Sequence, residues 1–132
     1  MEIGTSGRGF FELTDSITAF VTASGLKEGV LTLFCRHTSA SLTIQENASP
    51  EVLDDLLDWF DRLAPEAPER YRHGIEGPDD MPAHLRTVLT ASTLSIPVVD
   101  ARPVLGTWQG IYLIEHRSAP HVRQVVLHMM GV

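Results

Sequence analysis

The stretch from Val30 to Cys35 constrains the fold more than any other part of the chain. It reads Val-Leu-Thr-Leu-Phe-Cys, which is almost wholly apolar and of strand length. Such a run is typical of a β-strand that other elements cover on both faces. We therefore predict a central, doubly covered strand here, with the thiol of Cys35 buried in the core.

Weaker patterns predict the neighbours of this strand. After the polar residues 36–39, apolar and polar side chains alternate again through Leu42-Thr43-Ile44, which indicates a second strand. Residues 14–24 carry apolar side chains at helical spacing before Gly25, although their β-branched content leaves a strand open as the alternative. Further strands are expected at residues 10–13, 95–100, 111–117 and 122–130.

Two helices have clear signals at their beginnings. Ser49 and Pro50 are a typical N-cap and first helical residue. The predicted buried stripe of this helix is Leu53, Leu56, Leu57 and Phe60. Asp79 or Asp80 can cap the next helix, with Pro82 in its first turn. Its predicted core residues are Leu85, Val88 and Leu89.

Strand and helix signals follow one another without a regular βαβ alternation. This order predicts an α+β fold in which a few helices pack on a largely antiparallel or mixed sheet. The 132 residues suit one domain, spanning 1–132, that can bury a core without disulfides.

Composition argues against several classes of function. The net charge of −7 disfavours a nucleic-acid-binding protein, but a few arginines can still bind an anionic small molecule. No apolar run approaches the ~20 residues of a membrane-spanning helix, so no membrane partner is expected. Because the N-terminus lacks signal-peptide features and Cys35 is the only cysteine, we expect a protein of the reducing cytoplasm.

The loop at residues 71–84 holds more ligand-type side chains than a simple connection needs. It contains His73, His84 and three carboxylates, together with glycines and prolines that restrict the backbone. A solvated connection with an acidic helix cap is the alternative. The expected position of His84 near a helix N-terminus disfavours its charged form, which suits a neutral ligand or a base.

Two other clusters could carry chemistry. Residues 37–40 lie at a strand junction and are followed by Glu46-Asn47. Hydroxyls and turn amides beside a histidine can hold an anion while the imidazole moves a proton. The other cluster, residues 115–117, ends a strand, where alternation lets either His116 or its two neighbours face inward. If the clusters meet, they provide enough ligands for a zinc-type site of three protein groups and water.

Three segments occur in a recognisable order, namely 37–40 with 46–47, then 76–84, then 105–112. Together they resemble the YjbQ-like family, also described as secondary thiamine-phosphate synthases, and the resemblance covers nearly the whole chain. It implies one α+β domain that assembles as a compact homotrimer with a polar pocket near the subunit boundaries. It also implies a weak ability to condense a hydroxymethylpyrimidine pyrophosphate with a thiazole phosphate, giving thiamine phosphate.

The resemblance further implies roles for individual residues. Those expected to act in catalysis are His37, Asn47 and His84. Those expected to bind the phosphorylated small molecule are Thr38, Ser39, Glu46, Glu76, Trp108 and Gln109. A divalent metal, zinc or magnesium, is expected on His73, His84 and His116. Residues from His37 to Gln109 are predicted to share one cavity. The alternative is a non-catalytic trimer that binds a metal or an anion.

Overall fold

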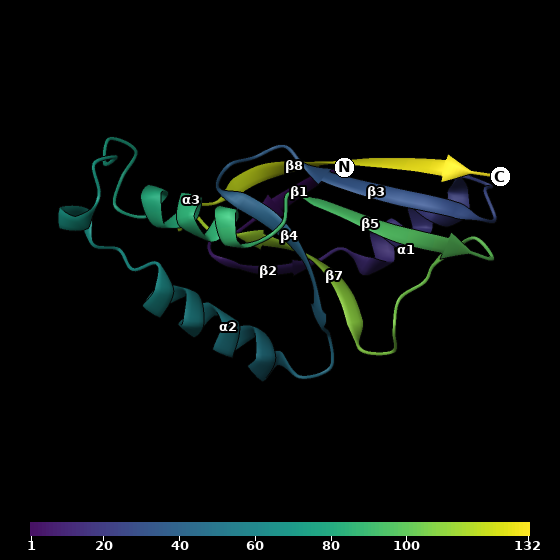
Figure 1. Ribbon diagram of the computed structural model, residues 1–132, viewed down its shortest axis with the longest axis horizontal. Helices are drawn as coiled ribbons and strands as arrows, with labels where there is room; N and C mark the ends of the chain where they lie inside the picture. Colours follow the sequence, from purple (N-terminus) through teal and green to yellow (C-terminus); the bar gives the residue numbers. More distant parts are fainter.

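The computed structural model describes all 132 residues, which form two β-sheets and three α-helices (Figure 1). The strands are β1 (Glu2–Thr5), β2 (Gly9–Glu12), β3 (Gly29–Cys35), β4 (Ala40–Glu46), β5 (Thr93–Val99), β6 (Arg102–Pro103), β7 (Gln109–Glu115) and β8 (His121–Gly131). The helices are α1 (Thr14–Ala23), α2 (Pro50–Leu63) and α3 (Asp80–Leu89), and a 3₁₀ turn covers Pro68–Arg70. The α+β prediction is confirmed.

The larger sheet has the strand order β1-β8-β3-β5-β6, and the smaller sheet has the order β2-β7-β4. All pairings are antiparallel. Apolar side chains from α1 and from both sheets form one core between the sheets. Its buried members are Leu13, Ile17, Val21, Leu31, Leu33, Cys35, Ala40, Leu42, Ile96, Val98, Ile111, Leu113 and Val125.

Strand β3 is central in its sheet, as predicted, but it is covered on one face only. Leu31, Leu33 and Cys35 point into the core, whereas Val30 and Phe34 are 44% and 47% exposed. The prediction of a doubly covered strand is therefore wrong for β3, because the outer face of the larger sheet stays exposed. The strand buried on both faces is β7, in which residues 110–115 are all buried.

The positions at which the helices begin agree with the prediction better than the residues that the helices bury. Helix α2 starts at Pro50 with Ser49 in the N-cap position, but Phe60 is its only fully buried residue. The predicted core face of α3 is wrong, since Val88 is 82% exposed and Leu89 is 55% exposed. The residues that α3 buries are Asp80, Pro82, Ala83 and Arg86. None of the helices has both the length and the apolar composition needed to cross a membrane.

Candidate functional site

Two histidines and one aspartate converge at the beginning of α3, and we call His73, Asp80 and His84 the cation cluster. Asp80 is the first residue of the helix and His84 follows one turn later, so both side chains lie on one face. Oδ2 of Asp80 lies 2.8 Å from Nε2 of His73 and 3.1 Å from Nε2 of His84. The three possible ligand atoms lie within 4.8 Å of one another.

Hydrogen bonds from outside the cluster orient its side chains. Nδ1 of His84 donates to the Thr38 carbonyl at 2.9 Å, so in the neutral imidazole the lone pair is on Nε2 and faces Asp80. The other oxygen of Asp80, Oδ1, accepts a bond from Nη1 of Arg117 at 2.9 Å. Backbone carbonyls and charged side chains orient the histidines and carboxylates of metal sites in the same way.

Asp80 is held in its ionised form. Burial alone would raise the pKa of this carboxyl group. The hydrogen bond from His73 and the charges of His84 and Arg117 outweigh that effect and lower the pKa below its ordinary value. An ionised oxygen that faces two imidazole nitrogens needs positive charge between them, supplied either by protons or by a metal ion. The cluster therefore has the donor set of a cation site, with two nitrogens and one oxygen.

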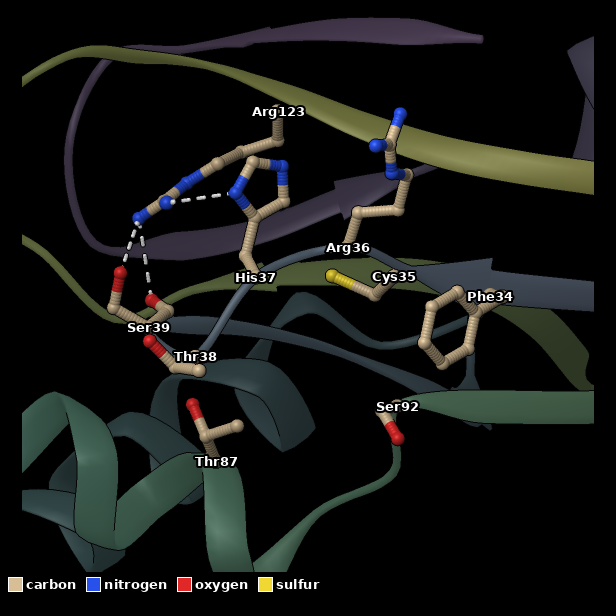
Figure 2. Close-up of a pocket in the computed structure, with 9 residues that line it drawn as sticks. All are labelled: Phe34, Cys35, Arg36, His37, Thr38, Ser39, Thr87, Ser92 and Arg123. Carbon is tan, nitrogen blue, oxygen red and sulfur yellow. Dashed lines mark hydrogen bonds between the residues drawn. The ribbon is translucent and has the colours of Figure 1, made fainter.

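An open hollow of about 750 Å³ adjoins the cation cluster, and we call it the His37 hollow (Figure 2). The residues that line it are Phe34, Cys35, Arg36, His37, Thr38, Ser39, Thr87, Ser92 and Arg123. Thr38 joins the two features, because it lines the hollow while its carbonyl binds His84. Thr87 lies one turn beyond His84 on the same face of α3. The cluster and the hollow are thus neighbours that Thr38 and α3 connect.

Guanidinium and hydroxyl groups surround this hollow. Figure 2 shows Arg123 and His37 on one side, with Thr87 and Ser92 on the opposite side. Nη2 of Arg123 donates to the hydroxyl and the carbonyl of Ser39, at 3.0 and 3.3 Å. Arg36 contributes a second guanidinium group. Groups of these two kinds are the usual donors to phosphate and carboxylate oxygens.

His37 is held as a neutral ring. Its Nε2 accepts a hydrogen bond from the backbone N–H of Gln124 at 2.8 Å, and its Nδ1 lies 3.5 Å from Nη1 of Arg123. Both ring nitrogens face N–H donors, so a doubly protonated ring would satisfy neither of them. Partial burial and the positive charge of Arg123 accordingly lower the pKa of His37.

Comparison with known proteins places the chain in a family. The profile described as "UPF0047 protein YjbQ-like" matches residues 1–132. The chain belongs to the YjbQ/UPF0047 family. UPF0047 protein sll1880 of Synechocystis is 53% identical over 129 residues, which cover 98% of this chain and 88% of that protein. UPF0047 protein YjbQ of Escherichia coli O157:H7 is 37% identical over 132 residues, covering 99% and 95%.

Solved structures with this fold agree with the assignment to the YjbQ/UPF0047 family. An uncharacterized family member from Clostridium acetobutylicum has a TM-score of 0.87 and 33% identity, covering 98% of this chain and 99% of that chain. A YbjQ-like protein of unknown function from Sulfolobus solfataricus has a TM-score of 0.89 at 23% identity, with 100% and 96% covered, and shows the fold alone. The family and its α+β fold follow from these likenesses.

Part of the predicted YjbQ-family site does come together. His73 and His84 meet in the cation cluster, and residues 37–39 line the adjoining hollow. The third member of the cluster is Asp80, one of the three carboxylates of the loop at residues 71–84, for which only a role as helix cap was predicted by name. Its spacing of four residues from His84 could have shown that the two side chains share a helix face.

His116 lies elsewhere, so the prediction that it joins His73 and His84 in one metal site is wrong. It is 2% exposed, its Nε2 lies 2.8 Å from Oγ of Ser41, and its ring packs edge-on against Phe60. The sequence also predicts that only one face of the strand end at residues 115–117 is buried, and this prediction is wrong. Glu115 and His116 are both buried, because β7 is covered on both faces.

Glu46 and Asn47 lie at the opposite end of β4 from residues 37–39. They line a separate hollow of about 300 Å³ together with Glu12 and Tyr112. Gly110 permits this close packing, since a Cβ there would meet Asn47 and Tyr112 at 3.0 Å. Within one chain, the residues predicted to share a single cavity therefore divide between two separate hollows.

Three other residues predicted to bind substrate line neither hollow. Trp108 is 63% exposed, and Oε1 of Gln109 accepts a hydrogen bond from the Gly106 backbone N–H at 2.7 Å, which stabilises the turn before β7. Glu76 offers its backbone carbonyl to Nη2 of Arg117 at 3.0 Å. A role for these residues in binding substrate stays a prediction.

Arg123 lines the hollow but was not among the predicted residues, although the sequence contains a signal for it. Along β8 the inward-facing side chains are Arg123, Val125 and Leu127, so a charged residue takes its place in an otherwise apolar row. Charged side chains are seldom buried unless they are paired. A charge at such a position therefore indicates a buried partner or a ligand.

Proposed function

We propose that this YjbQ/UPF0047 protein binds a phosphorylated small molecule in the His37 hollow and a divalent cation at the cation cluster. The observation that carries the proposal is the position of Thr38, whose carbonyl orients His84 while Thr38 itself lines the hollow. A cation on one side and guanidinium groups on the other suit a phosphate or pyrophosphate, because both neutralise its negative charge.

The donor set favours zinc over magnesium. Zinc is commonly bound by histidine nitrogens and a carboxylate oxygen, with a fourth position left for water or a substrate oxygen. Magnesium prefers oxygen ligands and keeps much of its water. Residues His73, Asp80 and His84 would hold the zinc ion, and when bound it would stabilise negative charge on a phosphate oxygen.

The reaction we propose is the condensation of a hydroxymethylpyrimidine pyrophosphate with a thiazole phosphate, in the cytoplasm and as a weak activity. The carbon–oxygen bond of the pyrimidine methylene breaks, and pyrophosphate leaves with the electron pair. The lone pair of the thiazole nitrogen then forms the new carbon–nitrogen bond. Arg36 and Arg123 would neutralise the leaving charge, and the hydroxyls of Thr38 and Ser39 would position the phosphate.

Loss of one ligand is expected to remove zinc binding. Calorimetric titration of the metal-free protein with zinc should give one site per chain in the wild type. His84→Ala should weaken zinc binding by at least about 100-fold, since even the loss of a partner behind a metal ligand costs 10–100-fold. His128→Ala, at an exposed position on the outer face of β8, should bind zinc as the wild type does.

The same variants separate the cation site from the reaction. Formation of thiamine phosphate by the wild type, and its loss in His84→Ala, would support both parts of the proposal. Equal zinc affinity in the wild type and in His84→Ala would refute the cation site. Zinc binding without any product would refute the reaction and favour the second candidate.

The second candidate is a non-catalytic homotrimer that binds a metal or an anion. The outer face of β8, β3 and β5 favours assembly, because its side chains include no aspartate, glutamate, lysine or arginine although the chain has a net charge of −7. Its exposed apolar residues are Val30, Phe34, Val99, Val122, Val126 and Met130. A large apolar patch usually marks an interaction surface, and an uncharged one can meet its own copy without repulsion.

A charge placed on this face is expected to dissociate the trimer. In sedimentation experiments the wild type should behave as three chains. Val126→Asp should weaken association by at least about 100-fold, because an unpaired charge buried in an interface costs several kcal/mol. Val88→Asp is the control, since Val88 is 82% exposed on α3, away from this sheet. A wild type that stays monomeric at all concentrations would contradict the homotrimer.

A further inference from the structure

A third hollow lies against the side of α3 that faces away from the cation cluster, and we call it the Arg86 hollow. It has a volume of about 330 Å³, and the residues that line it are Arg8, Leu57, Asp61, Arg86 and Ser118. Arg86 follows His84 by two residues and therefore points to the opposite side of the helix. The Arg86 hollow shares no lining residue with the His37 hollow.

Arg86 is a buried cation with an unused donor. The residue is 2% exposed, and its Nη2 donates to Oδ1 of Asp61 at 3.0 Å and to the Ala64 carbonyl at 3.1 Å. Its Nε is closed off from solvent and has no hydrogen-bond partner. Buried N–H groups are nearly always paired, so this one lacks an acceptor in the folded chain, and a small movement of the side chain toward the hollow would let an anion supply it.

Two arginines share one hydrogen-bonding carboxylate in this hollow, and Glu66 acts on Arg86 only through its charge. Oδ1 of Asp61 accepts hydrogen bonds from both Arg8 and Arg86, each at 3.0 Å, so one carboxylate serves two guanidinium groups. The side chain of Asp61 is 54% exposed whereas that of Arg86 is 3% exposed, so solvent screens the carboxylate more than the buried cation. Burial and the charge of Arg8 lower the pKa of Arg86, and a bound anion would oppose that effect.

We propose that the Arg86 hollow binds a phosphate group, either as inorganic phosphate or as part of a small phosphorylated molecule. Donors line it from three segments, with Arg8 before β2, Arg86 on α3 and Ser118 after β7. Donors from several directions match the tetrahedral oxygens of phosphate better than they match the two coplanar oxygens of a carboxylate. This site is independent of the proposed function, which uses the other side of α3.

Nuclear magnetic resonance of ¹⁵N-labelled protein tests phosphate binding through the signal of the Arg86 Nε–H group. The Nε–H signal of Arg86, assigned by its loss in Arg86→Lys, is expected to shift and saturate as inorganic phosphate is added at constant ionic strength. Arg8→Ala should weaken this binding about tenfold, because it removes one charged donor. Arg8 pairs with Asp61 at the surface, where such ion pairs add little stability, so the variant should fold.

Two further variants sharpen the test. Asp61→Asn should strengthen phosphate binding at Arg86, because it removes the competing negative charge. Arg62→Ala, at an exposed arginine next to Asp61, is the matched control and should leave the affinity unchanged. If Arg86→Lys does not fold, the Nε–H signal of Arg86 can instead be assigned by correlating it with the backbone signals of the same residue.

Several outcomes would overturn the proposal. If phosphate shifts the signals of Ser39 and Thr87 but not that of Arg86, the His37 hollow binds phosphate and the Arg86 hollow does not. If acetate shifts the Arg86 signal as strongly as phosphate does, the site does not select phosphate over a carboxylate. If Arg8→Ala binds phosphate at Arg86 with wild-type affinity, the two arginines do not share a ligand.

Discussion

Acidification from about pH 7.5 to pH 4.5 is expected to lower the free energy of unfolding by about 3 kcal/mol through His116 alone. Burial, together with the charge of Arg86, lowers the pKa of His116 from 6.5 to about 3. The unfolded chain binds a proton at this imidazole below pH 6.5, whereas the folded chain does not until about pH 3. The contribution to stability is therefore complete above pH 6.5 and is lost as the pH falls toward 3.

Urea unfolding at a series of pH values measures this dependence. His116→Gln keeps an amide that can bond to Ser41 but removes the titrating group, so its stability should vary with pH by about 3 kcal/mol less than that of the wild type. His128→Gln, at an exposed position, should keep the wild-type dependence. Parallel curves for the wild type and His116→Gln would contradict the neutral, buried imidazole.

The pH range chosen for the His116 prediction ends at 4.5, because buried carboxyl groups also begin to affect stability at lower pH. The pKa values of Asp79, Asp80 and Glu115 are lowered in the folded protein, because hydrogen bonds and positive charges outweigh the effect of burial on each carboxyl group. A carboxyl group of this kind stabilises the fold above its unfolded pKa, which is 3.8 for aspartate and 4.5 for glutamate. These contributions are lost only at lower pH and would then add to that of His116.

Strong local patterns were enough to predict most elements of this fold. Strands β3 and β7 and the beginning of α2 lie where the sequence places them, and residues 14–23 form a helix rather than the alternative strand. Strand β1 was missed because Glu2-Ile3-Gly4-Thr5 has no apolar pattern of its own. It becomes a strand by pairing with residues 121–124 of β8, which are far away in the sequence.

In helix α3 the spacing of apolar residues does not predict which face is buried. Its apolar residue Val88 faces solvent, while Asp80 and Arg86 are buried. The reason is that both charged residues have partners on other elements, since Arg117 pairs with Asp80 and Asp61 pairs with Arg86. Helical spacing carries no information about such partners, so a sequence alone favours the apolar face.

The same limit applies to the candidate site. The density of ligand-type side chains in one loop was enough to single out His73 and His84. Arg123, in contrast, lies 86 residues from His37 and reaches the hollow only because β8 pairs with β3. The cation cluster is mostly local in sequence, whereas the anion-binding side of the surface depends on strand pairing.

Glu115→Gln is expected to lower the free energy of unfolding by about 3–5 kcal/mol. The side chains of Glu115 and Arg123 are 0% and 6% exposed, and they form a buried ion pair. Nε of Arg123 donates to Oε1 of Glu115 at 2.9 Å, and the hydroxyl of Thr5 donates to the same oxygen at 2.7 Å. Glutamine keeps the size of the side chain, so the loss comes from the guanidinium group left buried without its counter-ion.

A double-mutant cycle isolates the pair. Arg123→Met alone should also be costly, but the variant with both changes should lose at least about 1 kcal/mol less than the two single losses combined, because no unpaired charge remains. Glu2→Gln, at an exposed glutamate of β1, should stay within about 0.5 kcal/mol of the wild type. Strictly additive losses would mean that the two side chains do not interact.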